Sequence, residues 1–194
     1  ASTGPVYIGK EASIMEGCLI RGPFAMGEKS CLKMGTKIYG ATTLGPGCVG
    51  GGEIKNAVLF GYSNKAHEGY LGDAVIGEWC NLGAGTSNSN LKNNASPVKV
   101  WTTEGEVVAG PKCGVMMGDY SKTAINTSIN TGTVIGVSCN VFGNGLTLKF
   151  IPSFFWGSEG LSRYRFEKAI TDIEGWKKLK GILIGIKLLK ITIK

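Results

Sequence analysis

A single histidine, His67, stands among the 194 residues of the chain, inside the sequence NKAHEGYLGD. An imidazole ring, with an ordinary pKa of about 6.5, can accept a proton at neutral pH and suits general-base catalysis. A lone histidine is more often structural than catalytic, but this one is flanked by Lys65, Glu68 and Tyr70. One histidine cannot build a multi-histidine metal site, so we expect no metal in this chain.

Further polar side chains lie on either side of this histidine. Lys55 precedes it in the sequence GGEIKN, and Asn81 follows it in IGEWCNLGAG. A lysine supplies a compact positive charge, and an asparagine can donate and accept hydrogen bonds. The alternative for Lys55 and Lys65 is a solvated surface charge, and the alternative for Asn81 is a turn residue.

Residues 86–104, TSNSNLKNNASPVKVWTTE, have no periodicity and are rich in Asn and Ser. Such a stretch is typical of a projecting loop, and projecting loops commonly carry functional groups. Asn90 and Lys99 lie in this stretch, where on residue type alone they could be a turn residue and a solvated surface charge.

A six-residue repeat indicates which elements position these side chains. Every sixth residue from the eighth to the forty-fourth is large and apolar: Ile8, Ile14, Ile20, Met26, Leu32, Ile38 and Leu44. The step recurs at Ile129, Ile135 and Val141. A period of six fits neither the 3.6-residue α-helix nor the two-residue strand. It predicts a coil of very short strands, in which three hexads close one triangular turn and the apolar residues stack inside.

Glycine accounts for 31 residues and follows the repeated apolar residue at many positions, among them Gly27 and Gly77. We expect these glycines to adopt positive φ in the turns of the coil. The glycines have no G-X-Y period and the chain has only six prolines, which excludes collagen. A hydrophobic content of 43% with 18% charged residues excludes intrinsic disorder.

The repeat slips over residues 50–66, is interrupted by residues 86–104, and stops after Gly145. We therefore expect a β-helix over residues 1–147 and a capping segment over residues 148–194. Within that segment, residues 163–180 carry Phe166, Ile170 and Ile173 at helical spacing. The predicted helix would cover the open end of the coil, whose strand edges would otherwise be unpaired.

Charge is concentrated at the C-terminus, because six of the 21 basic residues and no acidic residue lie within residues 176–194. The formal net charge of +7 is therefore largely a property of this basic tail, and the nearly neutral body argues against a nucleic-acid partner. The apolar stretch GILIGIKLLKITI is interrupted by Lys187 and Lys190 and is too short to cross a bilayer.

The six cysteines are irregularly spaced and form no CxxC motif: Cys18, Cys31, Cys48, Cys80, Cys113 and Cys139. Four of them follow a repeated apolar residue by four positions, where we expect small, partly buried thiols with a structural role. No signal peptide opens the chain, so we expect reduced thiols and a cytoplasmic location. The first residue is Ala1 rather than Met, which suggests a fragment of a longer protein.

The repeat resembles the hexapeptide-repeat family, whose fold is the left-handed parallel β-helix. The run KAHEGYLGDAVIGEWCNLGAGTSNSN resembles the acetyltransferase half of the bifunctional glucosamine-1-phosphate acetyltransferase / N-acetylglucosamine-1-phosphate uridylyltransferase family. That family carries K-A-G-H-x-x-Y-x-G-D followed by I-G-x-x-x-N-I-G-A-G-T, and the similarity covers roughly residues 50–143. Departures include the missing glycine before His67 and Leu91 in place of an aromatic residue. The layout also resembles sugar-1-phosphate nucleotidyltransferases.

The resemblance implies acyl transfer from acetyl-CoA to the amine of an amino-sugar 1-phosphate, with glucosamine 1-phosphate as the favoured acceptor and His67 as general base. The substrate-binding positions that it implies are Lys55, Tyr70, Asn81, Asn90, Lys99 and Lys37. Lys37 lies near the position of a phosphate-binding arginine of the family but lacks the forked guanidinium. The implied acetyl-CoA-binding positions are Ala84, through its backbone N–H, Asp119 and Val137.

The resemblance also implies a homotrimer with sites between neighbouring subunits, and a fused N-terminal nucleotidyltransferase domain. No loop of the GxGTR kind occurs in this chain. The alternative is a non-catalytic β-helix that trimerises and regulates such a domain. A β-helical carbonic anhydrase needs three histidines and is excluded. An ice-binding β-helix needs a regular threonine row, and Thr127, Thr131 and Thr133 do not lie on one six-residue step.

Overall fold

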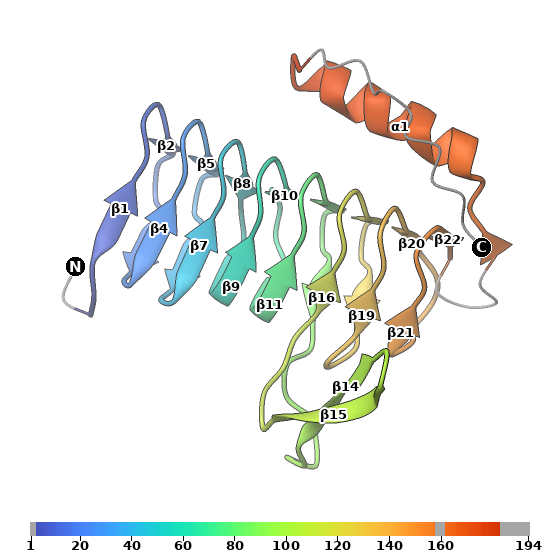
Figure 1. Ribbon diagram of the computed structural model, residues 1–194. Coiled ribbons are helices and arrows are strands. Elements are labelled where there is room, and N and C mark those ends of the chain that lie inside the picture. The colour runs from blue at the N-terminus through green and yellow to red at the C-terminus, as the bar shows by residue number, and fades with distance from the viewer. Residues whose placement is uncertain (1–2, 158–161, 183–194) are drawn as a thin grey trace.

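The computed structural model describes residues 3–157 and 162–182 as a parallel β-helix followed by one α-helix (Figure 1). Successive turns of the chain stack along one axis, and the coil is the left-handed β-helix that the resemblance to the hexapeptide-repeat family implies. Each turn contributes a short strand to each of three faces, so the strands of one face pair in parallel with the turns before and after.

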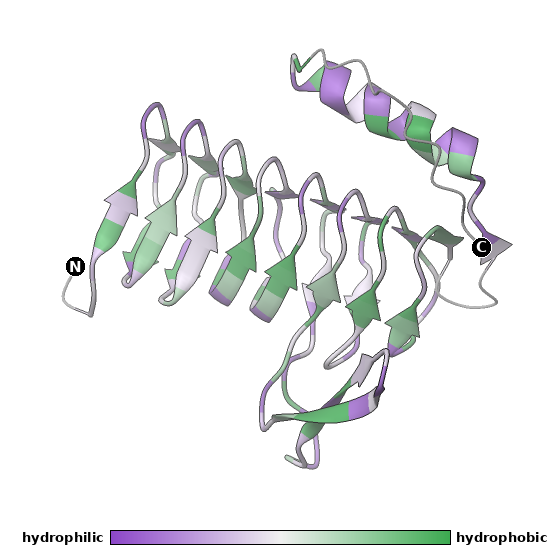
Figure 2. Cartoon of the chain, viewed as in Figure 1, coloured by the Kyte–Doolittle hydropathy of each residue, from purple (hydrophilic) through white to green (hydrophobic). Residues whose placement is uncertain are grey.

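The first face is the most extensive sheet, and two of its strands, β9 and β11, begin on the third face and turn the corner onto the first. Its strands are β1 (Val6–Ile8), β4 (Phe24–Met26), β7 (Thr42–Leu44), β9 (Glu53–Leu59), β11 (Tyr70–Ile76), β16 (Met116–Met117), β19 (Val134–Ile135) and β21 (Phe150–Ile151). Figure 2 shows that the strands of this face from β9 onward are predominantly hydrophobic.

The second face is built from strands of two residues: β2 (Ser13–Ile14), β5 (Cys31–Leu32), β8 (Val49–Gly50), β10 (Asn64–Lys65), β12 (Asn81–Leu82), β17 (Lys122–Thr123), β20 (Asn140–Val141), β22 (Phe155–Trp156) and the antiparallel β23 (Ser162–Arg163). The third face contains β3 (Leu19–Arg21), β6 (Lys37–Tyr39), the first halves of β9 and β11, β13 (Ser87–Asn88) and β18 (Ser128–Ile129).

The core consists of inward columns of stacked side chains. On the first face the column is Ile8, Met26, Leu44, Leu59, Ile76, Met117, Ile135 and Ile151, each paired in register with the next. All but Ile8, at the open end, are buried. Full burial of such a side chain contributes about 1.5–3 kcal/mol, so the columns account for the stability of strands only two or three residues long.

The glycines that follow the core residues do not have the conformation that the sequence analysis expected. Gly27 and Gly77 are absent from the positive-φ positions, so that prediction is wrong. They are instead required for close stacking of the turns, because a Cβ at Gly27 would lie 2.7 Å from the backbone nitrogen of Pro46. At Gly77 it would lie 2.7 Å from the backbone nitrogen of Asp119.

The insertion over residues 86–104 leads from β13 into a hairpin made of β14 (Val98–Thr102) and β15 (Gly105–Gly110). Val98 and Val100 are buried against Cys113, and the ring of Trp101 stacks on Phe150 with 3.6 Å between centroids. Part of the predicted loop is therefore an anchored antiparallel arm that projects from the coil (Figure 1).

The coil continues past residue 147, where the sequence analysis placed its end. β21 and β22 pair in parallel with β19 and β20 and add a further partial turn. The spacing hides this turn, because Ile151 follows Ile135 by 16 residues rather than by three hexads.

The helix α1 (Phe166–Leu179) buries Ala169 and Ile173 and lies along the second face of the coil rather than across its end (Figure 1). The residue after it, Lys180, donates hydrogen bonds to the coil, and Lys177 lies over the ring of Tyr120 at 5.6 Å. The helix therefore covers part of the second face of the coil and not its open end, which the sequence analysis expected it to cover. The rest of the basic tail, residues 183–194, lies outside the described residues. Within those residues, no helix is long and apolar enough to cross a membrane.

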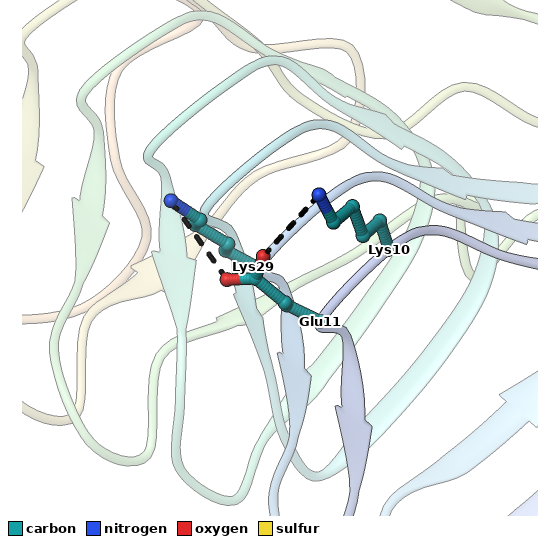
Figure 3. A network of polar contacts seen from close by, with 3 residues as sticks. All are labelled: Lys10, Glu11 and Lys29. Atoms are coloured by element: carbon teal, nitrogen blue, oxygen red, sulfur yellow. Dashed lines mark ion pairs between the residues drawn. The ribbon is translucent and has the colours of Figure 1, made fainter.

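Ion pairs contribute little to this architecture. Near the N-terminal end, Lys10 and Lys29 each lie 3.9 Å from a different carboxylate oxygen of Glu11 (Figure 3). All three side chains are more than half exposed. Exposed pairs of this kind are worth at most about 1 kcal/mol, so the three residues serve as neutral sites for control substitutions.

Candidate active site

His67 lies in the four-residue turn 66–69, at the corner where β10 of the second face leads to β11 of the third. Its side chain is exposed beside an open groove lined also by Met15, Lys33 and Met34 of earlier turns. The carbonyls of Glu68 and Gly69 accept hydrogen bonds from backbone N–H groups of adjacent turns, at 3.0 and 3.2 Å. The turn is thus fixed to the coil while the imidazole remains accessible.

Lys65, one of the possible surface charges, is instead inside the coil and only 1% exposed. Its ammonium nitrogen donates to the carbonyl oxygen of His67 at 2.5 Å and to that of Gly51 at 3.4 Å. Burial lowers the pKa of Lys65 to about 8, and the negative charge of Glu68 partly opposes that shift. The surface alternative is therefore wrong for Lys65.

Three residues after His67, Tyr70 enters a polar network. The side-chain nitrogen of Asn90 donates to the hydroxyl oxygen of Tyr70 at 3.0 Å and to a carboxylate oxygen of Asp73 at 2.5 Å. The other carboxylate oxygen of Asp73 accepts from Asn56 at 2.6 Å. Burial, and then the charge of Asp73, raises the pKa of Tyr70, so its hydroxyl stays protonated at neutral pH.

The two predicted phosphate-binding lysines lie on the same face as this network. Lys37 on β6 is in register with Glu53 on β9, and Glu53 is in register with Tyr70 on β11. Lys55 pairs with Gly72 on the same strands and is exposed. The structure thus brings together Lys37, Lys55, Tyr70 and Asn90 on the third face and at its edge.

Two other predicted substrate-binding residues lie elsewhere on the chain. Asn81 is on β12 of the second face, where its side-chain oxygen accepts a hydrogen bond from Asn64 at 3.3 Å. Lys99 is on the projecting hairpin, exposed, and 3.7 Å from the carboxylate of Glu106. Within a single subunit, Asn81 and Lys99 therefore lie apart from the Tyr70 network.

The predicted acetyl-CoA positions are also divided. Ala84 lies at the same corner as His67, one turn further along, since Gly85 donates to the carbonyl of Glu68. Asp119 and Val137 lie at the corner between the first and second faces. There the carboxylate of Asp119 accepts the backbone N–H of Glu78 at 2.8 Å. Asp119 therefore has a structural role already.

Three residues of this region were missed by sequence reasoning. Asp73 and Asn56 belong to the network described above, and Asp73 could have been found because it ends the H-x-x-Y-x-G-D motif. Asn88 is 3% exposed and occupies an inward position, where its side chain bonds both the N–H and the C=O of Gly72, at 2.8 and 2.9 Å. It ties the start of the insertion to β11. No group of three or more His, Cys, Asp or Glu that could hold a metal is found in the part of the chain that the structure describes.

Comparison with known proteins agrees with the resemblance to bifunctional acetyltransferases. No family model matches the chain. The bifunctional protein GlmU of Methanocaldococcus jannaschii is 38% identical over 87 residues, which are 45% of this chain and 21% of that protein. The bifunctional sugar-1-phosphate nucleotidylyltransferase/acetyltransferase of Sulfurisphaera tokodaii is 35% identical over 91 residues, 46% of this chain and 23% of that protein.

An uncharacterized acetyltransferase of Escherichia coli, YaiX, is 28% identical over 155 residues, which cover 78% of this chain and 67% of that protein. The chain spans less than a quarter of the length of the two bifunctional relatives named above. Over about half of its own length, the chain is a homologue of the bifunctional GlmU proteins.

Proposed function

We propose that the chain transfers the acetyl group of acetyl-CoA to the amine of an amino-sugar 1-phosphate, with glucosamine 1-phosphate as acceptor. The observation that carries the proposal is the arrangement around residues 64–90. An exposed imidazole stands on a turn held to the coil, three residues from a hydroxyl that is hydrogen-bonded to Asn90. The names of the homologues, which include an acetyltransferase, support the same reaction.

In this mechanism the imidazole of His67 accepts a proton from the amine as the nitrogen attacks the thioester carbonyl. A C–N bond forms and the carbonyl oxygen becomes an oxyanion, to which the backbone N–H of Ala84 would donate. The C–S bond then breaks, and the coenzyme A thiolate takes the proton from the imidazolium. The proton passes from the amine to the imidazole and on to the thiolate, and the electron pair of the broken C–S bond stays on sulfur. The reaction needs no metal.

The sugar phosphate would lie along the third face. Tyr70 and Asn90 would hold the sugar hydroxyls, while Lys55 and Lys37 would neutralise the phosphate. Lys55 lies on β9, which pairs with β11, and Lys37 lies on β6, which pairs with β9. The two cations would therefore lie on the same side of the sugar.

Asn81, Lys99, Asp119 and Val137 lie on other parts of the coil, and we propose that neighbouring copies in a homotrimer bring them to the site. A row of exposed apolar side chains on the first face supports such an interface. Val58, Val75, Met116 and Val134 are aligned in register, and the first three are 36–42% exposed. A row of this kind is typical of a surface that another subunit covers.

We further propose that the chain is the acetyltransferase part of a bifunctional protein with a nucleotidyltransferase domain, by analogy with its GlmU homologues. Its substrates, acetyl-CoA and a sugar phosphate, are cytoplasmic metabolites, which favours a cytoplasmic location.

The test is steady-state acetyl transfer from acetyl-CoA to glucosamine 1-phosphate by the wild-type protein and the His67→Ala variant. The variant should lose about 10²–10⁴-fold in kcat, the usual contribution of a general base, with the KM for acetyl-CoA little changed. The surface variant Lys29→Met is the control and should match the wild type. Wild-type turnover in His67→Ala would reject the base.

The same preparation distinguishes the alternative role of a non-catalytic trimerising domain. That role predicts a trimer that binds no coenzyme A in calorimetry and transfers no acetyl group. Calorimetric binding of coenzyme A with turnover would exclude it.

A further inference from the structure

Other turns of the coil have a four-residue corner at the same place as the His67 corner, residues 66–69. In two of them the side chain of the fourth residue donates a hydrogen bond to a carbonyl of the corner. The hydroxyl of Thr36 donates to the carbonyl of Lys33 at 2.6 Å, and that of Thr127 donates to the carbonyl of Ala124 at 2.8 Å. Both threonines are buried. The carbonyls of these corners point into the coil, where an unpaired carbonyl would be costly.

The His67 corner has no such hydroxyl. Its fourth residue is Gly69, whose φ of +123° is unfavourable for any side chain. A Cβ at Gly69 would also lie 2.1 Å from the carbonyl oxygen of Thr86. At this corner the inside donor is the ammonium of Lys65, 2.5 Å from the carbonyl oxygen of His67. It bonds the carbonyl of the second corner residue, whereas the threonines bond that of the first.

Lys65 occupies an inward position that most other turns give to apolar residues. The same column contains Ile14, Leu32, Leu82 and Val141, with Gly50 directly before Lys65 and the buried Thr123 as its other polar member. Within residues 3–157 and 162–182, Lys65 forms no ion pair. A buried ammonium without a carboxylate partner is unfavourable compared with leucine, so stability gives no reason for a lysine here.

We propose that Lys65 is a positioning residue for His67. Its buried ammonium holds the backbone carbonyl of His67 and so fixes the direction in which the imidazole points away from the coil. The proposal depends on the proposed role of His67 as base. Lys65 itself, enclosed by the coil, does not reach the substrate.

The preceding turn is shaped to admit this arrangement. A Cβ at Gly51 would lie 2.3 Å from the carbonyl oxygen of Ala66, and a Cβ at Gly52 would lie 2.8 Å from that of His67. The two glycines let the backbone of the His67 turn approach closely. Backbone hydrogen bonds hold the second half of the turn at Glu68 and Gly69, whereas the carbonyl of His67 receives its hydrogen bond from Lys65. Removal of the ammonium should therefore allow the turn to shift.

The test compares the wild type with Lys65→Met, which keeps the length and apolar stem of the side chain but removes its three donors. Lys65→Gln, which keeps a donor on a shorter side chain, is the second variant, and Lys29→Met is the surface control. Measurements are kcat, KM, the melting temperature, and the imidazole resonances in NMR. Because His67 is the only histidine, those resonances need no further assignment.

We expect Lys65→Met to lower kcat at least tenfold with KM for acetyl-CoA within twofold, and to shift or broaden the imidazole resonances. Its melting temperature should equal or exceed that of the wild type, because methionine suits the apolar column. Lys65→Gln should fall between the two. A kcat within twofold of wild type with unchanged imidazole resonances would overturn the proposal. A lower kcat that is accompanied by a lower melting temperature and unchanged resonances would overturn it as well.

Failure of the proposed function has a different signature. If His67→Ala retained full activity while Lys65→Met still displaced the imidazole resonances, the base would be wrong and the link between Lys65 and His67 would stand.

Discussion

The ammonium nitrogen of Lys180 lies 3.0 Å from the side-chain oxygen of Asn64, although the two residues are 116 positions apart in the chain. The same nitrogen donates to the backbone carbonyls of Gly47 and Tyr62, each at 3.0 Å. Three acceptors from two successive turns thus bind Lys180, the residue that directly follows α1. This contact holds the far end of the helix to the second face.

Lys180→Ala should therefore destabilise the protein, because three acceptors lose a charged donor. Hydrogen bonds to a charged group contribute about 1.5–3 kcal/mol, and the partial exposure of Lys180 lowers the expected loss to about 1–2 kcal/mol. Denaturant unfolding measures it. The exposed neighbour Lys178, replaced by alanine, is the control and should change stability by less than about 0.5 kcal/mol. Equal effects of the two substitutions would contradict the assigned contact.

The buried lysine should also make stability depend on pH. The pKa of Lys65 is about 8 in the folded protein, and about 10.4 is usual for an unfolded chain. Between these values the unfolded state binds more protons, so the free energy of unfolding rises with pH. The penalty is fully present below pH 8 and is relieved as the pH approaches 10.

The difference in free energy of unfolding between Lys65→Met and the wild type should therefore shrink by up to about 3 kcal/mol from pH 7 to pH 10. Chemical denaturation at several pH values gives the two curves. Curves that run parallel over this range would show that the ammonium is better solvated than its burial implies.

The cysteines should differ in reactivity. Burial raises the pKa of Cys48 to about 11 and that of Cys80 to about 12, whereas Cys18 and Cys31 are only half-buried. Only the thiolate reacts, so a disulfide reagent at pH 7.5 should label Cys18 and Cys31 well before the others. Peptide mapping after brief labelling identifies the sites, and denatured protein is the control, in which all six should react.

The network around Asp73 should matter for the acceptor rather than for acetyl-CoA. Asp73→Asn leaves a single oxygen where two carboxylate oxygens now accept from Asn56 and Asn90. Loss of one charged hydrogen bond loosens Asn90, and we expect about a tenfold rise in KM for glucosamine 1-phosphate. Tyr70→Phe, which removes only the hydroxyl contact, should have a smaller effect. A change confined to the KM for acetyl-CoA would contradict the assignment to the sugar.

The apolar row on the first face should be needed for assembly. Val75→Glu introduces a charge between Val58 and Met116, which would be unfavourable inside a subunit interface. The variant should be monomeric by light scattering, and its activity should fall because Asn81 and Lys99 would no longer reach the site. Tyr7→Glu on the outermost strand of the same face is the control. A wild-type monomer would contradict the proposed trimer directly.

The sequence predicts the coil because a six-residue period reports which residues face inward. The column from Ile8 through Leu44 follows it without exception, as the register of the strands confirms. The period does not report how long each corner is. Leu59 follows Leu44 by 15 positions and Ile151 follows Ile135 by 16, so the turn near residue 50 and the last turn were hidden.

The six-residue step also indicates that Lys65 points into the core, although its charge favours an exposed position. Leu59, Lys65 and Leu71 are six residues apart, which puts the lysine in phase with the core. A charged residue is rarely placed inside on sequence grounds because the cost of burial is high, and only the neighbouring carbonyls explain it. The resemblance to the family likewise predicts that Tyr70 and Asn81 share one site. In the structure the two residues lie on strands of different faces.

The hairpin of β14 and β15 interrupts the chain without interrupting the stack. Ile76 and Met117 are 41 positions apart, yet they pair in register as directly as Met117 and Ile135 do. A corner of such a coil can thus gain or lose a whole arm while the turns on either side keep the same neighbours. An insertion at this corner can therefore be replaced, in evolution or by design, by a hairpin from a related protein without any change in the stacking of the turns.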